Sequence, residues 1–280
     1  MNCEQHRQDK MRRRTDNLED VDHRRDQILT TLAHELSSPL AAVAYSAELL
    51  RGRDITPEVR ERAATIILEQ TDFMRRLVED ISDLRGIRSG NLGFRKTLTD
   101  LADVARLAVG ISRPLIERLG HALEIVTPQS PIRAQGDVAR LIRVVSNLLI
   151  NAARYTPKKG HIRLSIEQDD GAAVLRVKDN GIGIPKEMLT RVFDLFTRLE
   201  SAKQKYAGGM GIGLALVREL VEAHGGRVEA FSEGEGRGSE FVVRLPLADD
   251  MRLSATDVAA VDQGRYRTPP EAELRAMPVS

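Results

Sequence analysis

The apolar residues of this 280-residue chain follow one periodicity up to about residue 91 and another after it, and this change constrains the fold most. Before it, the apolar positions repeat at the three-and-four spacing of one helix face. After it, short stretches typical of strands alternate with helical ones, and glycines separate them. The sequence therefore predicts a purely helical first part, followed by a part that mixes helices and strands.

The helical part is predicted to be a hairpin. Residues 16–51 favour helix, and their apolar side chains fall on an a/d heptad frame at Leu29, Leu32, Leu36, Val43 and Leu50. Residues 52–57 supply a stop and a restart. Thr56 is placed as the N-cap and Pro57 as the first residue of a second helix, which ends near Ser89.

The second helix has an apolar face that is wider than one hairpin can bury. Its main stripe consists of Val59, Ala63, Ile66, Phe73, Leu77 and Leu84, and the face is widened by Ile67, Met74 and Ile81. A lone hairpin would leave this face half exposed. We therefore predict that two chains pair into a four-helix bundle, which makes the protein a homodimer.

The second part is predicted to be an α+β two-layer sandwich. Helices are expected at residues 100–119, 137–154 and 211–224, and strands at residues 121–127, 161–168, 173–178, 227–232 and 239–245. Residues 1–25 are expected to form an N-terminal helical linker. Residues 249–280 lose the periodicity and contain Thr268-Pro269-Pro270, which predicts a flexible tail.

The charge balance and the single cysteine exclude several classes of protein. Lys and Arg number 42 against 41 Asp and Glu, so no global basic field favours nucleic acid or a membrane surface as a partner. No apolar run approaches the roughly 18 residues of a membrane span, so the chain is expected to be cytoplasmic. Cys3 stands alone, which excludes an internal disulfide and a cysteine metal cluster.

His34 occupies an unusual place on the first predicted helix. With Leu29 at a and Leu32 at d, His34 falls at f, the position farthest from the seam, and Glu35 follows it. A lone histidine there is most often an ordinary surface residue. However, Pro39 removes the N–H that would bond the carbonyl of Glu35, at a cost of about 3 kcal/mol. An exposed neutral imidazole can attack a phosphoryl group through Nε2 when a neighbouring carboxylate accepts a hydrogen bond from Nδ1–H and stabilises the imidazolium.

The second part contains four segments that together can bind a nucleotide, although it has no Walker loop. In the first, a polar helix face carries Asn147, Asn151, Arg154 and Tyr155. The amide oxygen of Asn151 is a ligand for Mg²⁺, and Arg154 can donate to phosphate. An ordinary exposed helix face would show the same pattern.

The other three segments are built around glycines and phenylalanines. Residues 179–185 (Asp-Asn-Gly-Ile-Gly-Ile-Pro) are either a plain turn or a buried aspartate that accepts a hydrogen bond from adenine, worth about 1.5–3 kcal/mol. Residues 208–214 open a helix whose free N–H groups can hold phosphates. The charged residues 197–206 before them are typical of a lid, and not of the buried strand of a dinucleotide fold. Residues 193–196 pack either the base of the lid or the core.

These motifs resemble those of a known family. Residues 32–40 resemble the H-box of sensor histidine kinases, whose form of His-Glu-Leu, two variable residues and Pro-Leu is found here at residues 34–40. The four nucleotide segments, in their order, resemble the N, G1, F and G2 boxes of the GHKL ATP-binding domain. Residues 236–241 resemble its last strand entry. The resemblance covers about residues 26–247.

The resemblance implies roles for individual residues. His34 would be the phosphoacceptor, with Glu35 as base, and Asn151 would hold Mg²⁺. Asp179 would bind the adenine of ATP. The other residues implied in ATP binding are Asn147, Arg154, Tyr155, Gly181, Gly183, Phe196, Gly209, Gly211, Gly213, Leu214 and Ser239. Ser38 stands where the family usually has a threonine or asparagine that serves phosphatase activity.

The resemblance also implies an activity and its partners. Residues 26–90 would form a dimerisation and phosphotransfer domain, and residues 91–248 a catalytic ATP-binding domain. His34 would be phosphorylated by ATP and would pass the phosphoryl group to an aspartate of a response-regulator receiver domain. An upstream sensory domain or a separate sensor protein would supply the signal. Two alternatives are a GHKL ATPase without a phosphohistidine, which leaves His34 unexplained, and a non-catalytic dimeric interaction module, which leaves the nucleotide motifs unexplained.

Overall fold

A computed structural model describes residues 30, 32–33, 36–52, 55–88, 93–199 and 211–248. The contacts divide the chain into two compact units between Glu79 and Asp80. His34, Glu35 and Gly209 lie outside the described residues, as do the predicted linker at 1–25 and the predicted tail at 249–280.

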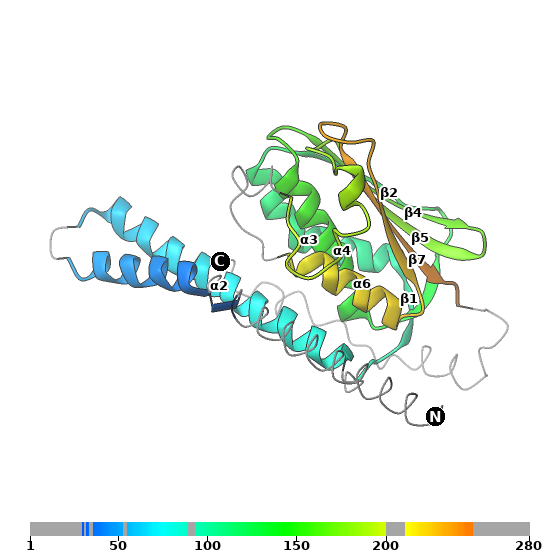
Figure 1. The fold of residues 1–280 in the computed structure, drawn as a ribbon, viewed down its shortest axis with the longest axis horizontal. Coiled ribbons are helices and arrows are strands. Elements are labelled where there is room, and N and C mark those ends of the chain that lie inside the picture. The colour runs from blue at the N-terminus through cyan, green and yellow to red at the C-terminus, as the bar shows by residue number, and fades with distance from the viewer. Residues whose placement is uncertain are drawn as a thin grey trace, which may run out of the picture. The chain divides into compact units, whose positions relative to one another are not determined.

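The first unit is helical. Residues 36–50 form a helix, and α2 (Pro57–Arg88) follows it and continues into the second unit (Figure 1). The hydroxyl oxygen of Thr56 accepts a hydrogen bond from the N–H of Val59 at 3.4 Å. The sequence therefore placed the start of this helix correctly, because a threonine just before the first turn satisfies one of its free N–H groups.

The buried seam of the helical unit agrees in part with the stripe predicted on the second helix, where Ala63 and Leu77 are buried, and differs from the heptad frame predicted on the first. Pro39 and Ser46 are buried on the first helix, and Ala63 and Leu77 on α2. The leucines and valine predicted at the seam, Leu32, Leu36, Val43 and Leu50, are only half-buried, and Val59 is 41% exposed. Small side chains occupy most of the seam within one chain, so the larger apolar residues lie beside it.

The second unit contains one large sheet and one small sheet. The five-stranded sheet has the order β2 (Ala122–Val126), β4 (His161–Asp169), β5 (Ala172–Asp179), β7 (Ser239–Pro246) and β6 (Arg227–Phe231). β2 pairs with β4 in parallel, and the other pairs are antiparallel. The small sheet pairs β1 (Thr97–Asp100) with β3 (Arg133–Gly136).

Three helices cover one face of the large sheet (Figure 1). They are α3 (Leu101–Arg118), α4 (Val138–Tyr155) and α6 (Gly213–Ala223). A short 3₁₀ turn, η1 (Lys186–Met188), follows β5. The predicted two-layer sandwich is confirmed, and all five predicted strands and three predicted helices are present within about two residues of their expected ends.

The helix starts differ from the prediction by a residue or two for a local reason. Asp100 and Asp137 are N-caps and not first helical residues, since their side chains accept hydrogen bonds from the N–H groups of Ala102 and Arg140. β1 and β3 were not predicted. Each is four residues long, and only their pairing with each other identifies them as strands.

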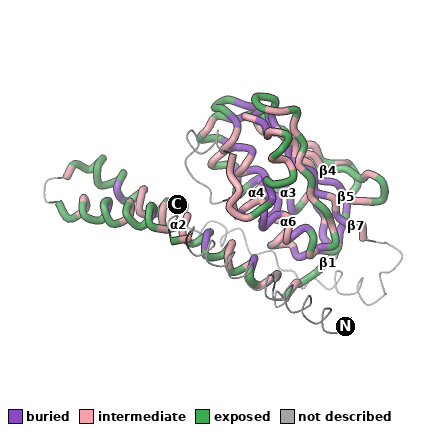
Figure 2. Tube along the Cα trace, in the orientation of Figure 1, coloured by how far each residue is buried: buried purple, intermediate pink, exposed green. Residues whose placement is uncertain are grey.

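The core lies between the helices and the sheet, and α4 is at its centre. Leu148 and Leu149 of α4 are 0% exposed, as are Leu216 and Leu220 of α6. Along β4, Ile162, Leu164 and Ile166 are buried and the residues between them are not, so only one face of this strand is covered by the core (Figure 2).

Candidate functional site

A cavity of about 60 Å³ lies where α4, β5, β7 and the start of α6 meet. Six residues predicted from the sequence line it: Asn151, Tyr155, Asp179, Gly183, Leu214 and Ser239. They come from four motifs that are up to 88 residues apart in the chain. The fold therefore brings the predicted motifs together around one site.

Asp179 is the central polar group of this cavity. It is the last residue of β5 and is only 5% exposed. Its Oδ1 accepts a hydrogen bond from the N–H of Gly181 at 2.8 Å, and its Oδ2 accepts one from the hydroxyl of Ser239 at 2.6 Å. A carboxylate has about four acceptor sites, so it can accept a further hydrogen bond from a ligand amino group.

The burial of Asp179 also affects its ionisation. Burial raises the pKa of this carboxyl, whereas the hydrogen bonds from Ser239 and Gly181 lower it. Burial is the larger effect because it disfavours the charged form. The two bonds hold the side chain in one orientation, with its free lone pairs available to the cavity.

Gly183 lets the backbone pass close to the segment that follows β6. Its φ is +71°, in the left-handed region, and a Cβ placed on it would collide with the carbonyl oxygen of Gly234. Ser232 braces the same loop, since its hydroxyl accepts from the N–H of Ile184 at 3.0 Å. Glycine is therefore required at 183 to keep this wall of the cavity in place.

Asn147 lies beside the first turn of α6. A Cβ placed on Gly213, the first residue of α6, would be 3.8 Å from Cγ of Asn147. The Nδ2 of Asn147 is buried and donates no hydrogen bond to any described residue. The residue before α6, Ile212, provides no side-chain cap. This corner therefore presents unused donors and a positive helix end, which suit an anion.

The two ends of the predicted lid are held together at its base. The N–H of Phe196 donates to the carbonyl of Gly211 at 3.0 Å. A Cβ placed on Gly211, whose φ is +70°, would lie 2.7 Å from the carbonyl carbon of Phe196. Phe193 is buried and packs edge-on against Phe241 of β7, with ring centres 6.1 Å apart.

Several predicted residues lie outside the lining of the cavity. They are Asn147, Arg154, Gly181, Phe196, Gly211 and Gly213. Conversely, the sequence reasoning missed part of the lining, namely Ala152, Ile182, Ile184, Val192, Thr197, Arg198, Leu199 and Phe241. Ile182 and Ile184 alternate with the glycines of the Asp179 segment, which was a usable signal. Residues 197–199 begin the predicted lid, but their residue types did not indicate that they line the cavity, because only the fold brings them there.

His224 fixes the relative position of the two helices that carry the site. Its Nε2 accepts a hydrogen bond from the N–H of Asp137 at 3.0 Å, and its Nδ1 is 2.6 Å from the carbonyl oxygen of Leu220. The ring of Phe94 packs against it edge-on at 5.1 Å. Burial lowers the pKa of His224, the Leu220 carbonyl raises it, and Lys96 and Arg140 lower it further.

Ser38 is exposed on the first helix. The hydroxyl of Ser37 beside it donates to the carbonyl of Ala33 at 2.6 Å.

Among the described helices, none is long and apolar enough to cross a membrane.

The fold and the cavity together define a GHKL-type ATP-binding domain. Residues 136–249 match the family of histidine kinase-, DNA gyrase B- and HSP90-like ATPases. Residues 24–90 match the His Kinase A (phospho-acceptor) domain. The chain belongs to the histidine kinases and contains the two domains of their catalytic core.

Individual relatives agree with this assignment. The probable sensor histidine kinase TcrY of Mycobacterium tuberculosis is 35% identical over 222 residues, which are 79% of this chain and 46% of TcrY. BaeS of Escherichia coli K12, a signal transduction histidine-protein kinase, is 31% identical over 84% of this chain and 50% of its own. The chain spans about half or less of the length of the curated relatives it matches.

Solved structures share the fold. Full-length ShkA, crystallised in complex with AMPPNP, has a TM-score of 0.58 and 27% identity, over 79% of this chain and 46% of that one. The histidine kinase AdeS of Acinetobacter baumannii has a TM-score of 0.61 at 23% identity, over 77% of this chain and 98% of that one.

Proposed function

We propose that this chain is the kinase core of a sensor histidine kinase. ATP phosphorylates His34, and the phosphoryl group then passes to an aspartate of a response-regulator receiver domain. The observation that carries the proposal is the buried Asp179, held by Ser239 and Gly181 at the cavity of a GHKL domain. A matched phospho-acceptor domain precedes it in the same chain.

The cavity suits the adenine of ATP. The carboxylate of Asp179 would accept a hydrogen bond from the amino group of the base. Ile182, Ile184, Val192 and Phe241 supply apolar walls for the ring. Residues 197–199, at the base of the lid, also line the cavity, so we expect them to move when nucleotide enters. AMPPNP in ShkA supports a nucleotide ligand for this fold.

The other end of the site suits the phosphates. The unused Nδ2 of Asn147 and the first N–H groups of α6 would donate to phosphate oxygens. The resemblance to the GHKL domain implies that Arg154 and Tyr155, at the end of α4, would also face the phosphates. The amide oxygen of Asn151 would hold Mg²⁺, which would neutralise charge on the phosphates. Positioning and charge neutralisation are most of what phosphoryl transfer requires.

In the transfer step, Nε2 of neutral His34 would attack the γ-phosphorus. The new P–N bond forms as the bond to the ADP oxygen breaks, and ADP leaves with that electron pair. Glu35 would accept a hydrogen bond from Nδ1–H and stabilise the positive charge that develops on the ring. Both side chains lie outside the described residues, so these roles rest on the H-box match.

We also propose that the helical hairpin, within residues 26–90, makes the protein a homodimer, and that residues 91–248 form the ATP-binding domain. Ile66, Ile67, Phe73 and Met74 of α2 remain only half-buried in a single chain. These large apolar residues lie beside the buried seam of the hairpin. They belong to the wide apolar face of the second helix, which was predicted to pack against the hairpin of a second chain. Covering them in a four-helix bundle would remove this apolar surface from water. The signal would come from a sensory domain or protein beyond this chain.

Incubation with γ-labelled ATP tests the proposed function. We expect acid-labile, alkali-stable label on the chain, and none on His34→Gln, which should still bind ATP. Loss of ATP without label would favour the plain ATPase. Neither label nor turnover, with purified chain and Mg²⁺, would favour the interaction module. Full label on His34→Gln would overturn the assignment of His34.

A further inference from the structure

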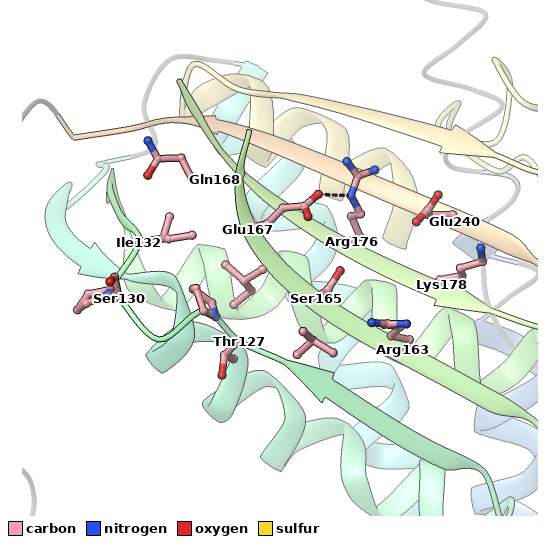
Figure 3. A pocket seen from close by; sticks show the side chains of 14 residues that line it. Thr127, Ser130, Ile132, Arg163, Ser165, Glu167, Gln168, Arg176, Lys178 and Glu240 are labelled. Atoms are coloured by element: carbon pink, nitrogen blue, oxygen red, sulfur yellow. Dashed lines mark hydrogen bonds and ion pairs between the residues drawn. The ribbon is translucent and has the colours of Figure 1, made fainter. Parts of the chain in front are cut away.

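The face of the large sheet opposite the helices contains a second, larger cavity. Its volume is about 580 Å³, within the range of about 300–1,000 Å³ typical of small-molecule sites. It lies between residues 126–132, which comprise the last residue of β2 and the segment after it, and the outward side chains of β4 and β5 (Figure 3). It shares no lining residue with the cavity of Asp179.

Three cationic side chains line this cavity. Strand pairing places Arg163 of β4 directly opposite Lys178 of β5, and Ser165 opposite Arg176. Two like charges in directly opposed positions destabilise a sheet, and an anion bound between them would reduce their repulsion. In Figure 3 Arg176 lies above Ser165, and Lys178 and Arg163 lie to its right, on the side of the sheet away from the helices.

Neighbouring carboxylates compensate this charge only in part. Arg176 pairs with Glu167 at 2.7 Å. Arg163 is 3.7 Å from Glu124, and both side chains are more than half exposed, so this pair is weak. The side chain of Lys178 makes no hydrogen bond or ion pair with any residue that the structure describes, although Glu240 lies opposite it on β7.

We propose that this cavity binds a small phosphate-bearing anion between Arg163 and Lys178, with the hydroxyl of Ser165 as a further donor. A phosphate dianion offers three oxygens, enough for a guanidinium, an ammonium and a hydroxyl at once. Pro128, Pro131 and Ile132 provide an apolar wall for the rest of the ligand. Glu240 opposes binding, because its carboxylate repels the anion.

Inorganic phosphate is the probe, titrated into the full ¹⁵N-labelled chain at constant ionic strength and followed by amide resonances. We expect saturable shifts at Ser165 and Lys178. Phosphate at the nucleotide site would instead shift Leu214, so the two sites are read separately. The amide shifts do not depend on kinase activity. A failure of the proposed phosphate site can therefore be distinguished from a failure of the proposed kinase function.

The variants make the test specific. Lys178→Gln and Arg163→Gln should each weaken phosphate binding about fivefold or more, since each removes a charged donor. Glu240→Gln should strengthen it. Lys186→Gln, an exposed lysine that lines neither cavity, should leave it unchanged. Three results would overturn the proposal: shifts that do not saturate, a phosphate affinity of Lys178→Gln equal to that of wild type, or weaker phosphate binding by Glu240→Gln.

Discussion

At the residue scale, Asp179 holds a charge in a place where burial disfavours it. Burial raises its pKa, so ionisation above that pKa costs folding stability, and its hydrogen bonds, chiefly those from Ser239 and Gly181, offset only part of this cost. The carboxylate is therefore better explained by ligand binding than by stability. Ser38 is the contrasting case. It is exposed, and no contact of its side chain with a described residue indicates a function.

Asp179→Asn should separate affinity from stability. The neutral amide removes the buried charge, so the free energy of unfolding of the ATP-free chain at pH 7 should stay within about 1 kcal/mol of wild type. ATP affinity should fall about tenfold or more, at roughly 1.4 kcal/mol per decade. Denaturant titration and nucleotide binding measure the two quantities. Unchanged affinity would remove Asp179 from the adenine site.

Ser38→Ala should change dephosphorylation of the regulator very little. A serine hydroxyl reaches less far than an amide, and it lacks the methyl that restricts the rotamer of threonine. With ADP and phosphorylated regulator, we expect slow and nearly equal decay for wild type and variant. Fast decay in wild type that is lost in Ser38→Ala, with autophosphorylation retained, would contradict this prediction.

At the scale of elements, the helices α4 and α6 are joined by a hydrogen bond between the start of α4 and the end of α6, away from the cavity. His224 follows the last residue of α6 and accepts from the cap residue of α4. This bond requires an unprotonated Nε2. The correct approach of Asn147 to the first turn of α6 therefore depends in part on a neutral histidine at the opposite end of that helix.

The bond of His224 predicts a pH dependence of stability. Burial and two cations, Lys96 and Arg140, lower its pKa below 6.5, although Asp137 opposes them. The unfolded chain thus binds the proton more readily, and stability is complete above about pH 6.5 and falls as the pH drops through the window down to the folded pKa. Between pH 7 and 5 we expect a loss on the order of 1 kcal/mol from this group.

His224→Gln provides the comparison. The glutamine amide can accept from Asp137 and donate to Leu220, and it does not titrate. Denaturant unfolding of both proteins at several pH values should show a steeper acid loss in wild type. Parallel curves would show that His224 does not titrate in this window.

At the scale of the whole molecule, the helical unit leaves large apolar residues half-buried beside a seam of small ones. Ile67→Glu would place a charge in the proposed dimer interface and should raise the dimer dissociation constant about tenfold or more. Leu68→Glu is the matched control, since Leu68 is 57% exposed and faces away from the seam. Sedimentation of both variants measures the effect. Equal dissociation in the two would contradict the proposed interface.

The sequence by itself determined the elements and the motifs. Helix caps such as Thr56, the glycines beside Asp179 and the alternation along β4 act within a few residues, so their pattern can be read locally. The nucleotide motifs were also recognisable from residue type and order. Their chemistry depends on which groups are present, and Asp179, Asn151 and Ser239 do meet at one cavity.

Only the tertiary structure decided which distant segments meet. The bond between Asp179 and Ser239 joins residues 60 apart, and the pairing of β1 with β3 joins two stretches that show no strand pattern of their own. The same holds for residues 197–199 at the nucleotide cavity and for Arg163 opposite Lys178. Such contacts follow from how the helices and sheet pack, because strand order and register are set by the shared core and not by local pattern.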